Sequence, residues 1–400
     1  MPAGPAASHE PAVPGGARLP PSHPNQDANQ ARREPRPTGF MATGQVHEEQ
    51  GTSHEPERGR PRPRHSRFMV TRHGRQVRGL PKRGVFRLSA AHMQGIALLF
   101  AGQGSQVVGM GRDFVTQSAT AREWFARAQA VLGYDLGALC FEGPEDELTQ
   151  TEHAQPAIFL VSWVAFQLLR ERLPQLTVQA MAGLSLGEFT ALAAAGALGF
   201  EDGLRLVRQR GRFMQEACEA SRGGMAAVLG LDEALTREVC AETGVSLANL
   251  NCPGQLVISG EADRVQRACE LAQAKGARRA LPLPVAGAYH SPLMAPAQPR
   301  LAAELAAAAI QPPAVPVVSN VTAQPHGDPA SIRQRLVEQV TAPVRWEQSM
   351  RHLLAQGVNR FIELGPGTAL TGFMKRIEKS AVALNVADGP SLEATVRALA

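Results

Sequence analysis

The chain has 400 residues, 44% of them hydrophobic, and a formal net charge of +5 at pH 7. Residues 1–92 contain 15 basic and 7 acidic residues, a net charge of +8, whereas residues 93–400 contain 26 basic and 29 acidic residues, a net charge of −3. Because the basic excess is confined to residues 1–92, the rest of the chain gives no reason to expect a nucleic-acid partner.

The first 92 residues differ from the remainder in pattern as well as in charge. They contain 13 of the 30 prolines and no periodic apolar run. Such a segment cannot bury enough apolar surface to offset its chain entropy, so we expect it to be disordered. The alternative to disorder is that translation starts at Met93, just ahead of the first strand-like run. In that case residues 1–92 are not part of the protein. A targeting peptide is disfavoured because acidic residues stand between the prolines.

The cysteines and the apolar stretches indicate the compartment. All five cysteines lie after residue 92, without a C-x-x-C pair. This is typical of reduced, buried thiols in a cytoplasmic protein and fits no metal site. The most apolar stretch, residues 156–169, is too short to span a bilayer, so we expect no membrane association.

In chain order, the first predicted elements alternate between strands and helices. A continuous apolar run predicts a buried strand at residues 96–100, and a glycine-rich loop follows at residues 101–106. A long helix is expected at residues 155–173, a strand at 179–183 and another helix at 202–220. This alternation is typical of an α/β layer structure.

Residues 222–286 have a different pattern, β-α-β-β-α-β, which is the ferredoxin-like arrangement. Its strands are expected at 225–229, 245–250, 256–259 and 279–285, its helices at 232–243 and 262–275, and a hairpin turn at 251–254. The earlier alternation resumes with strands at 315–321 and 360–364. We therefore predict an α/β fold in which residues 93–221 and 287–400 form one large domain, with residues 222–286 inserted as a ferredoxin-like subdomain.

A pentapeptide in this large domain predicts a nucleophile. Gly183-Leu184-Ser185-Leu186-Gly187 has the G-x-S-x-G pattern of a nucleophile elbow, preceded by a predicted strand and followed by helix formers. In an α/β-hydrolase-like domain, this turn lifts the serine hydroxyl clear of the backbone. A helix beginning at Leu186 also points its free N–H groups at an oxyanion beside Ser185.

A serine nucleophile needs a base, and the chain after residue 92 has four histidines: His153, His290, His326 and His352. His290 is favoured because it follows a predicted strand, and α/β sheets build their sites at strand ends. His153 is the second candidate. His326 lies in a proline-rich loop and is expected to face solvent, and His352 falls within a helical pattern.

The predicted helix at 202–220 carries four arginines, Arg205, Arg208, Arg210 and Arg212. Most of them should form a solvated face with neighbouring acids. One arginine buried beside the elbow would hold a substrate carboxylate through its two-pronged guanidinium. The residue pattern by itself does not choose among the four.

Five motifs give the chain from Met93 onward a resemblance to a known family. They are Gly102–Gln106, Gly183–Glu188, Gln209–Glu216, Tyr289–Met294 and Glu363–Gly367. In this order and over this length, they resemble the malonyl-CoA:acyl carrier protein transacylases of fatty-acid synthesis, and they are similar to the acyltransferase domains of polyketide synthases.

The resemblance implies a role for each matching residue. Ser185 would become a malonyl ester, with His290 as its base. The backbone N–H groups of Gln103 and Leu186 would form the oxyanion hole, and Arg210 would pair with the malonyl carboxylate. Two further positions are supporting ones: the carbonyl of Gln339 would orient the histidine, and Gln155 would line the pocket.

The resemblance also implies the substrates and partners. A monomeric [acyl-carrier-protein] S-malonyltransferase would take malonyl-CoA and load the phosphopantetheine thiol of acyl carrier protein, with no cofactor and no metal. The carrier is expected to be acidic, and exposed basic residues that could receive it are Arg278, Arg279, Lys375 and Arg376. Many family members have histidine where this chain has Leu184, and often phenylalanine or a small residue where it has Tyr289, a position that helps set acyl size.

Three alternatives stay open at this point. An α/β-hydrolase-type esterase or thioesterase would share the serine chemistry, but it should carry an acid between serine and histidine and an HGGG-type loop, which is absent. A transacylase subunit of a malonate-decarboxylating complex lies within the same family. A non-catalytic carrier-binding relative is disfavoured because the serine, histidine and arginine are all present.

Overall fold

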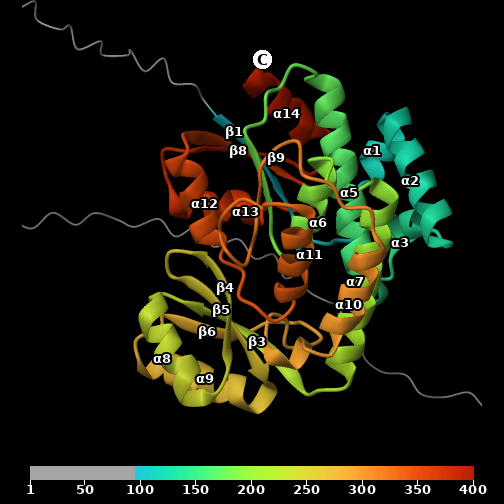
Figure 1. The fold of residues 1–400 in the computed structure, drawn as a ribbon. Coiled ribbons are helices and arrows are strands. Elements are labelled where there is room, and N and C mark those ends of the chain that lie inside the picture. Colours follow the sequence, from blue (N-terminus) through green and yellow to red (C-terminus); the bar gives the residue numbers. More distant parts are fainter. Residues whose placement is uncertain (1–94) are drawn as a thin grey trace, which may run out of the picture. The chain divides into compact units, whose positions relative to one another are not determined.

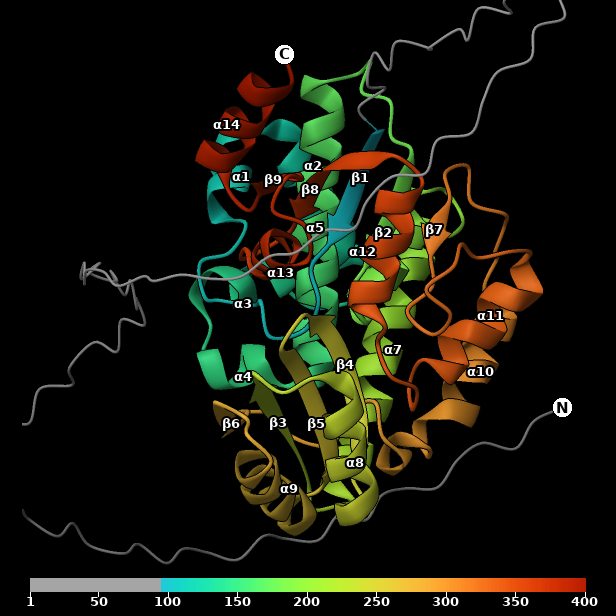
Figure 2. The ribbon, with the colours of Figure 1, turned by 90° about the vertical axis from the view of Figure 1, so that its left-hand side faces the viewer.

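The computed structural model describes residues 95–400, which belong to one compact unit containing two β-sheets (Figures 1 and 2). The predictions for residues 1–92 and for a start at Met93 lie outside the described residues. Within residues 95–400, no helix is both long enough and apolar enough to cross a membrane.

The first sheet is parallel and has five strands in the order β7-β2-β1-β8-β9. Its central strand β1 (Gly95–Phe100) pairs with β2 (Ala180–Gly183) and β8 (Val358–Leu364), and the outer strands are β7 (Val317–Val318) and β9 (Val382–Val386). The predicted α/β architecture with a parallel sheet is therefore present.

Helices cover both faces of this sheet, so β1 is apolar on both faces. Leu98 and Phe100 point into a core shared with α5 (Thr151–Arg172), α6 (Leu186–Ala194) and α7 (Phe200–Glu219). Ala97 and Leu99 belong to a second core, shared with α12 (Trp346–Ala355) and α13 (Ala369–Ile377). The remaining helices outside the second sheet are α1 (Arg112–Gln117), α2 (Ala119–Leu132), α3 (Leu136–Glu142), α4 (Glu145–Thr149), η1 (Pro292–Met294, a 3-10 helix), α10 (Ala297–Ala307), α11 (Pro329–Glu338) and α14 (Gly389–Leu399).

The second sheet is antiparallel and has four strands in the order β4-β5-β3-β6. Its elements in chain order are β3 (Gly223–Leu229), α8 (Glu233–Thr243), β4 (Ser246–Cys252), β5 (Gln255–Glu261), α9 (Ala262–Ala274) and β6 (Arg279–Pro282). Helices α8 and α9 cover one face and enclose a separate apolar core with the strands (Figure 1). The β-α-β-β-α-β order expected for this region is thus observed.

Backbone hydrogen bonds join strand β4 of the antiparallel sheet to Val344, in the segment that precedes α12. Its N–H donates to the carbonyl of Ala248 at 2.8 Å, and its carbonyl accepts from the N–H of Leu250 at 2.9 Å. Because Ala248 and Leu250 lie in β4, these bonds fix the antiparallel sheet against the segment between α11 and α12.

Several predicted boundaries were wrong for local reasons. The hairpin turn is shorter than expected, since β4 and β5 extend to Cys252 and Gln255 and leave only Pro253 and Gly254 between them. Strand β6 ends at Pro282 instead of at residue 285. Proline has no backbone N–H, so Pro282 and Pro284 lack donors that a longer strand would need. Strand β7 has only two residues instead of seven.

Candidate active site

The candidate nucleophile lies at a strained turn between β2 and α6. Ser185 has φ 53° and ψ −105°, which few residues other than glycine adopt. A Cβ atom on Gly183 would lie 1.9 Å from the carbonyl carbon of Gly187, and one on Gly187 would lie 2.3 Å from the carbonyl oxygen of Phe100. Only glycine fits at these two positions, so the G-x-S-x-G pattern is explained by close backbone packing.

His290 lies directly against this serine. Its Nε2 is 2.9 Å from Ser185 Oγ, and its Nδ1 is 2.9 Å from the carbonyl oxygen of Gln339 and 3.1 Å from that of Ala342. Since carbonyl oxygens only accept, Nδ1 carries the proton, and Nε2 is left as the acceptor that faces the hydroxyl. Burial, together with the nearby cation of Arg210, lowers the pKa of His290 to about 4.

Arg210 is the buried arginine of α7, with 1% of its surface exposed. Its Nη2 donates to Ser185 Oγ at 3.0 Å and to Gln339 Oε1 at 2.9 Å, and its Nη1 donates to Gln155 Oε1 at 2.8 Å. Burial lowers the pKa of Arg210 to about 10, so the guanidinium is still charged at neutral pH. Among the described residues it makes no ion pair, so a full positive charge beside the nucleophile lacks a directly bonded anion.

The other three arginines of α7 face outward. Arg205 pairs with Asp202 and Arg212 with Glu216, while Arg208 donates to the carbonyl of Leu132. The helical period of 3.6 residues places position 210 on the buried face and its neighbours on the solvated face. Tertiary structure thus selects one of the four candidates.

Two backbone amides near Ser185 have no acceptor within the described part of the chain: those of Gln103 and Leu186. Leu186 is the first residue of α6, where an N–H group has no partner within the helix. Gln103 lies in the loop after β1, where its side chain donates to Tyr289 Oη at 3.3 Å and to Thr151 Oγ1 at 3.4 Å. Tyr289 and Thr151 are in turn hydrogen-bonded to each other.

A cavity of about 410 Å³ opens onto Ser185 and His290. One wall comes from the parallel-sheet region and includes Gln103 and Phe373, and the opposite wall comes from the antiparallel sheet and includes Asn249 and Val257. The site therefore needs both sheets. A substrate with an apolar body and a few polar groups fits such a lining.

Of the residues predicted from the sequence to form the site, some lie together around Ser185 and others lie elsewhere. The five side chains of Ser185, His290, Arg210, Gln155 and Gln339 form a continuous hydrogen-bonded set around the serine hydroxyl. His153 is not part of it; it lies on α5 near Glu147 and Tyr134. His352 lies on α12, partly exposed.

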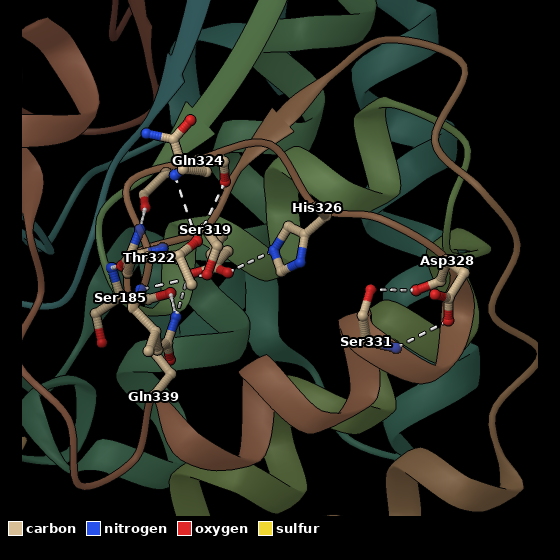
Figure 3. A network of polar contacts seen from close by, with 12 residues as sticks. Ser185, Ser319, Thr322, Gln324, His326, Asp328, Ser331 and Gln339 are labelled. Atoms are coloured by element: carbon tan, nitrogen blue, oxygen red, sulfur yellow. Dashed lines mark hydrogen bonds and ion pairs between the residues drawn. The ribbon is translucent and has the colours of Figure 1, made fainter. Parts of the chain in front are cut away.

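The expectation for His326 was wrong. Its side chain has no exposed surface and is paired with the equally buried carboxylate of Glu188, at 2.6 Å from Nε2 to Oε1. The imidazole points from its loop toward the polar network that includes Ser185 and Gln339 (Figure 3).

Sequence reasoning also missed three residues that shape the site, Glu188, Asn320 and Thr151. Asn320 holds the elbow from below, because its Oδ1 accepts from Ser185 N at 2.6 Å and its Nδ2 donates to the Gly183 carbonyl at 2.8 Å. Its position two residues after the short apolar strand β7 was the available signal, since polar residues at strand ends gather at one sheet edge.

Fold and site together define a serine-dependent acyl transferase. Residues 97–394 match the family model described as the acyl transferase domain, and the chain belongs to this family. Among curated relatives, it is 45% identical over 312 residues to the malonyl CoA-acyl carrier protein transacylase of Bacillus subtilis, covering 77% of this chain and 98% of the Bacillus protein.

Solved structures agree with this assignment. The malonyl CoA-acyl carrier protein transacylase from Coxiella burnetii superposes with a TM-score of 0.74 at 39% identity, covering 76% of this chain and 97% of that one. A malonyl-transacylase in complex with a type II PKS acyl-carrier protein also has a TM-score of 0.74, at 40% identity, over 76% of this chain and 99% of that one.

Proposed function

We propose that this chain transfers the malonyl group from malonyl-CoA to the phosphopantetheine thiol of acyl carrier protein, supplying fatty-acid synthesis. The observation that carries the proposal is the buried guanidinium of Arg210, 3.0 Å from the hydroxyl that His290 also contacts. A nucleophile beside a buried cation that makes no ion pair with the described residues suits an acyl group that bears its own carboxylate. The malonyl transacylases among the relatives support the same substrate.

In the first half of the reaction, Nε2 of His290 takes the proton of Ser185 Oγ as that oxygen attacks the thioester carbonyl. The tetrahedral oxyanion would be held by the N–H groups of Gln103 and Leu186, whose donors are free to receive it. As the C–S bond breaks, the imidazolium returns its proton to the departing thiolate. The products are coenzyme A and malonyl-Ser185.

In the second half, the carrier's thiol takes the place of coenzyme A. His290 accepts the thiol proton, the thiolate attacks the ester carbonyl, and the same proton then goes to Ser185 Oγ as the C–O bond breaks. Every step uses groups of this chain and its substrates, and we propose that no metal or cofactor takes part.

Arg210 is proposed to bind the malonyl carboxylate with its two Nη groups. In the free protein these groups donate to Ser185, Gln339 and Gln155, which are all neutral acceptors. A carboxylate is a stronger acceptor than a hydroxyl oxygen, so it can displace Ser185 Oγ from Nη2 at low cost. Gln155 and Gln339 would then hold the guanidinium in place from the other side.

We further propose that residues 93–221 and 287–400 form an α/β-hydrolase-like domain and that residues 222–286 form an inserted ferredoxin-like subdomain. The parallel sheet with its elbow supports the first, and the β4-β5-β3-β6 order of the antiparallel sheet supports the second. We also propose a monomer, and a location in the cytoplasm, which the five free and buried cysteines support.

The experiment is to incubate the purified chain with malonyl-CoA, with and without holo acyl carrier protein, and to follow intact masses. Transfer predicts an acyl-enzyme that persists without the carrier and is discharged to it when it is added. Rapid release of free malonate irrespective of the carrier would instead identify an esterase. If neither the enzyme nor the carrier gained a malonyl group, the proposal would be wrong.

A further inference from the structure

A buried carboxylate lies under the active-site elbow without contacting the cavity. Glu188, on the first turn of α6, has no exposed surface. A carboxylate in such a place is strongly destabilising unless donors satisfy it. Here Oε1 accepts from His326 Nε2 at 2.6 Å, and Oε2 accepts from Gln339 Nε2 at 2.6 Å and from Asn320 N at 3.0 Å (Figure 3).

Gln339 connects this carboxylate to the reacting groups. Its Nε2 donates to Glu188 and to the carbonyl of Ser185, its Oε1 accepts from Arg210, and its backbone carbonyl accepts from His290. A carboxylate can face only the NH2 end of an amide. Glu188 therefore fixes the orientation of the Gln339 side chain, so that the oxygen faces Arg210.

The loop that carries His326 is itself firmly placed. The backbone N–H of His326 donates to the carbonyl of Val317 in β7 at 2.8 Å. Two residues later, Asp328 caps α11, accepting from the backbone N–H groups of Ala330 at 2.8 Å and Ser331 at 3.0 Å (Figure 3). Gln339 is the C-cap of the same helix. The segment 326–328 therefore positions the imidazole of His326 and, through α11, also Gln339.

The hydrogen bonds also indicate the charge state of this pair. His326 Nδ1 has no partner within the described residues. An imidazolium would leave a charged N–H donor buried there without an acceptor, so a neutral ring that donates from Nε2 is favoured. A neutral His326 ring leaves the Glu188 carboxylate to act on Arg210, where it favours the charged guanidinium and raises the pKa of Arg210 against the effect of burial.

We propose that His326 is a positioning residue for malonyl transfer, acting through Glu188 and Gln339. It supplies the donor that holds the Glu188 carboxylate in place. The carboxylate in turn orients the Gln339 amide that supports Arg210, and it balances the charge of that guanidinium. This role rests on the proposed function, because it concerns the residue that would receive the malonyl carboxylate.

The test compares two substitutions, His326→Leu and His326→Gln, in the full chain. Leucine removes the donor to Glu188, whereas glutamine can place an amide N–H near the position of Nε2. We expect the ratio of malonyl to acetyl acylation rates to fall about tenfold in H326L, since small displacements of a binding group cost rate, and to stay within about twofold of the original in H326Q. Val317→Ala is the matched control, because it loosens the same strand without touching the polar network.

The outcomes separate positioning from stability alone. An unchanged acyl ratio in H326L, an equal loss in H326Q, or an equal shift in V317A would each overturn the role of His326. If H326L does not fold, nitrogen-15 NMR of the unsubstituted protein tests the proposal instead. We expect a neutral His326 ring that is protonated at Nε2. An imidazolium or a ring protonated at Nδ1 would contradict the proposal. Because this arm needs no substrate, it is independent of the malonyl transfer activity, whose absence in the unsubstituted chain would refute only the proposed function.

Discussion

The parallel-sheet region and the antiparallel-sheet region meet at one cavity but are built differently. Residues 223–282, which form the antiparallel sheet with α8 and α9, bury no charged side chain. Their ion pairs, such as Arg237 with Glu233 and Lys275 with Glu242, lie at the surface. Around the elbow, by contrast, Glu188, Arg210 and His290 are all buried, and two non-glycine residues, Ser185 and His290, have positive φ.

Energetically unfavourable features, namely buried charges and strained backbone, are thus concentrated around the elbow in the parallel-sheet region. Strained backbone and buried charge each cost on the order of 1–3 kcal/mol or more. Apolar cores on both faces of the parallel sheet offset that cost, and the antiparallel sheet carries no such burden. We infer that the second region contributes shape to the cavity wall, whereas the first contributes the chemistry. The following predictions, ordered by their effect on acyl transfer, test this division.

The largest effect is expected for Ser185→Ala. Removal of the nucleophile should abolish the acyl-enzyme and lower transfer by about 10⁴-fold or more. Intact mass after incubation with malonyl-CoA measures the first, and carrier loading measures the second. A malonyl group still bound to the S185A chain would place the nucleophile elsewhere and remove the elbow from the mechanism.

Arg210→Ala should have the next largest effect, and the effect should be selective. Loss of the guanidinium removes the charge-assisted bonds to the malonyl carboxylate, so malonyl transfer should fall by about a hundredfold. Acetyl transfer should fall much less, because an acetyl group has no carboxylate to bind. The measurement is kcat/KM for both acyl-CoA substrates. Equal losses on the two would show that Arg210 only supports the fold.

The pH dependence should also distinguish the two regions, since residues 223–282 contain no histidine. The pKa of His290 is lowered from 6.5 to about 4, so the ring stays neutral and able to accept a proton well below pH 6.5. The acylation rate should therefore stay flat from about pH 8 to about pH 5 and fall tenfold per unit below about pH 4. Stability should fall as the pH drops below 6.5, because the unfolded chain then binds the proton first. A rate that already halves near pH 6.5 would contradict the lowered pKa.

The smallest effect on transfer is expected in the antiparallel sheet. Ile258 lies in the middle of β5, fully buried in the core shared with α8 and α9, and does not line the cavity. Ile258→Ala should lower the free energy of unfolding by about 2–5 kcal/mol while the malonyl-to-acetyl ratio stays unchanged. Thermal unfolding and the two acylation rates check this. A changed ratio would mean that this region also tunes the chemistry.

Much of the site was readable from the sequence because its signals are local. The elbow motif follows from backbone geometry, because the surrounding backbone leaves no room for a Cβ atom at positions 183 and 187. The helix from Leu186 begins where its pattern predicts. The family motifs named His290 and Arg210, which the structure brings to within hydrogen-bonding distance of Ser185.

The failures came where a contact spans a long stretch of chain. Glu188 and His326 are separated by 138 positions, and no local pattern relates them. The proline-rich loop around His326 predicts an exposed side chain. The ring points inward because the loop packs against the elbow, where it meets Glu188. The length of β7 was overestimated for a similar reason. The strand ends because Ser319 closes a turn with Ala323 and Gln324, and Asn320 bonds to the elbow at Ser185.

What the chain determines locally is therefore its set of strands and helices, the turn that exposes one serine, and the family to which it belongs. The burial of Arg210 among the four arginines of α7, the inward orientation of His326 and the cavity lined by both sheets depend on the tertiary structure. The physical reason is that burial and hydrogen-bond partners decide the chemistry of a charged side chain, and both are set by residues far away in the sequence.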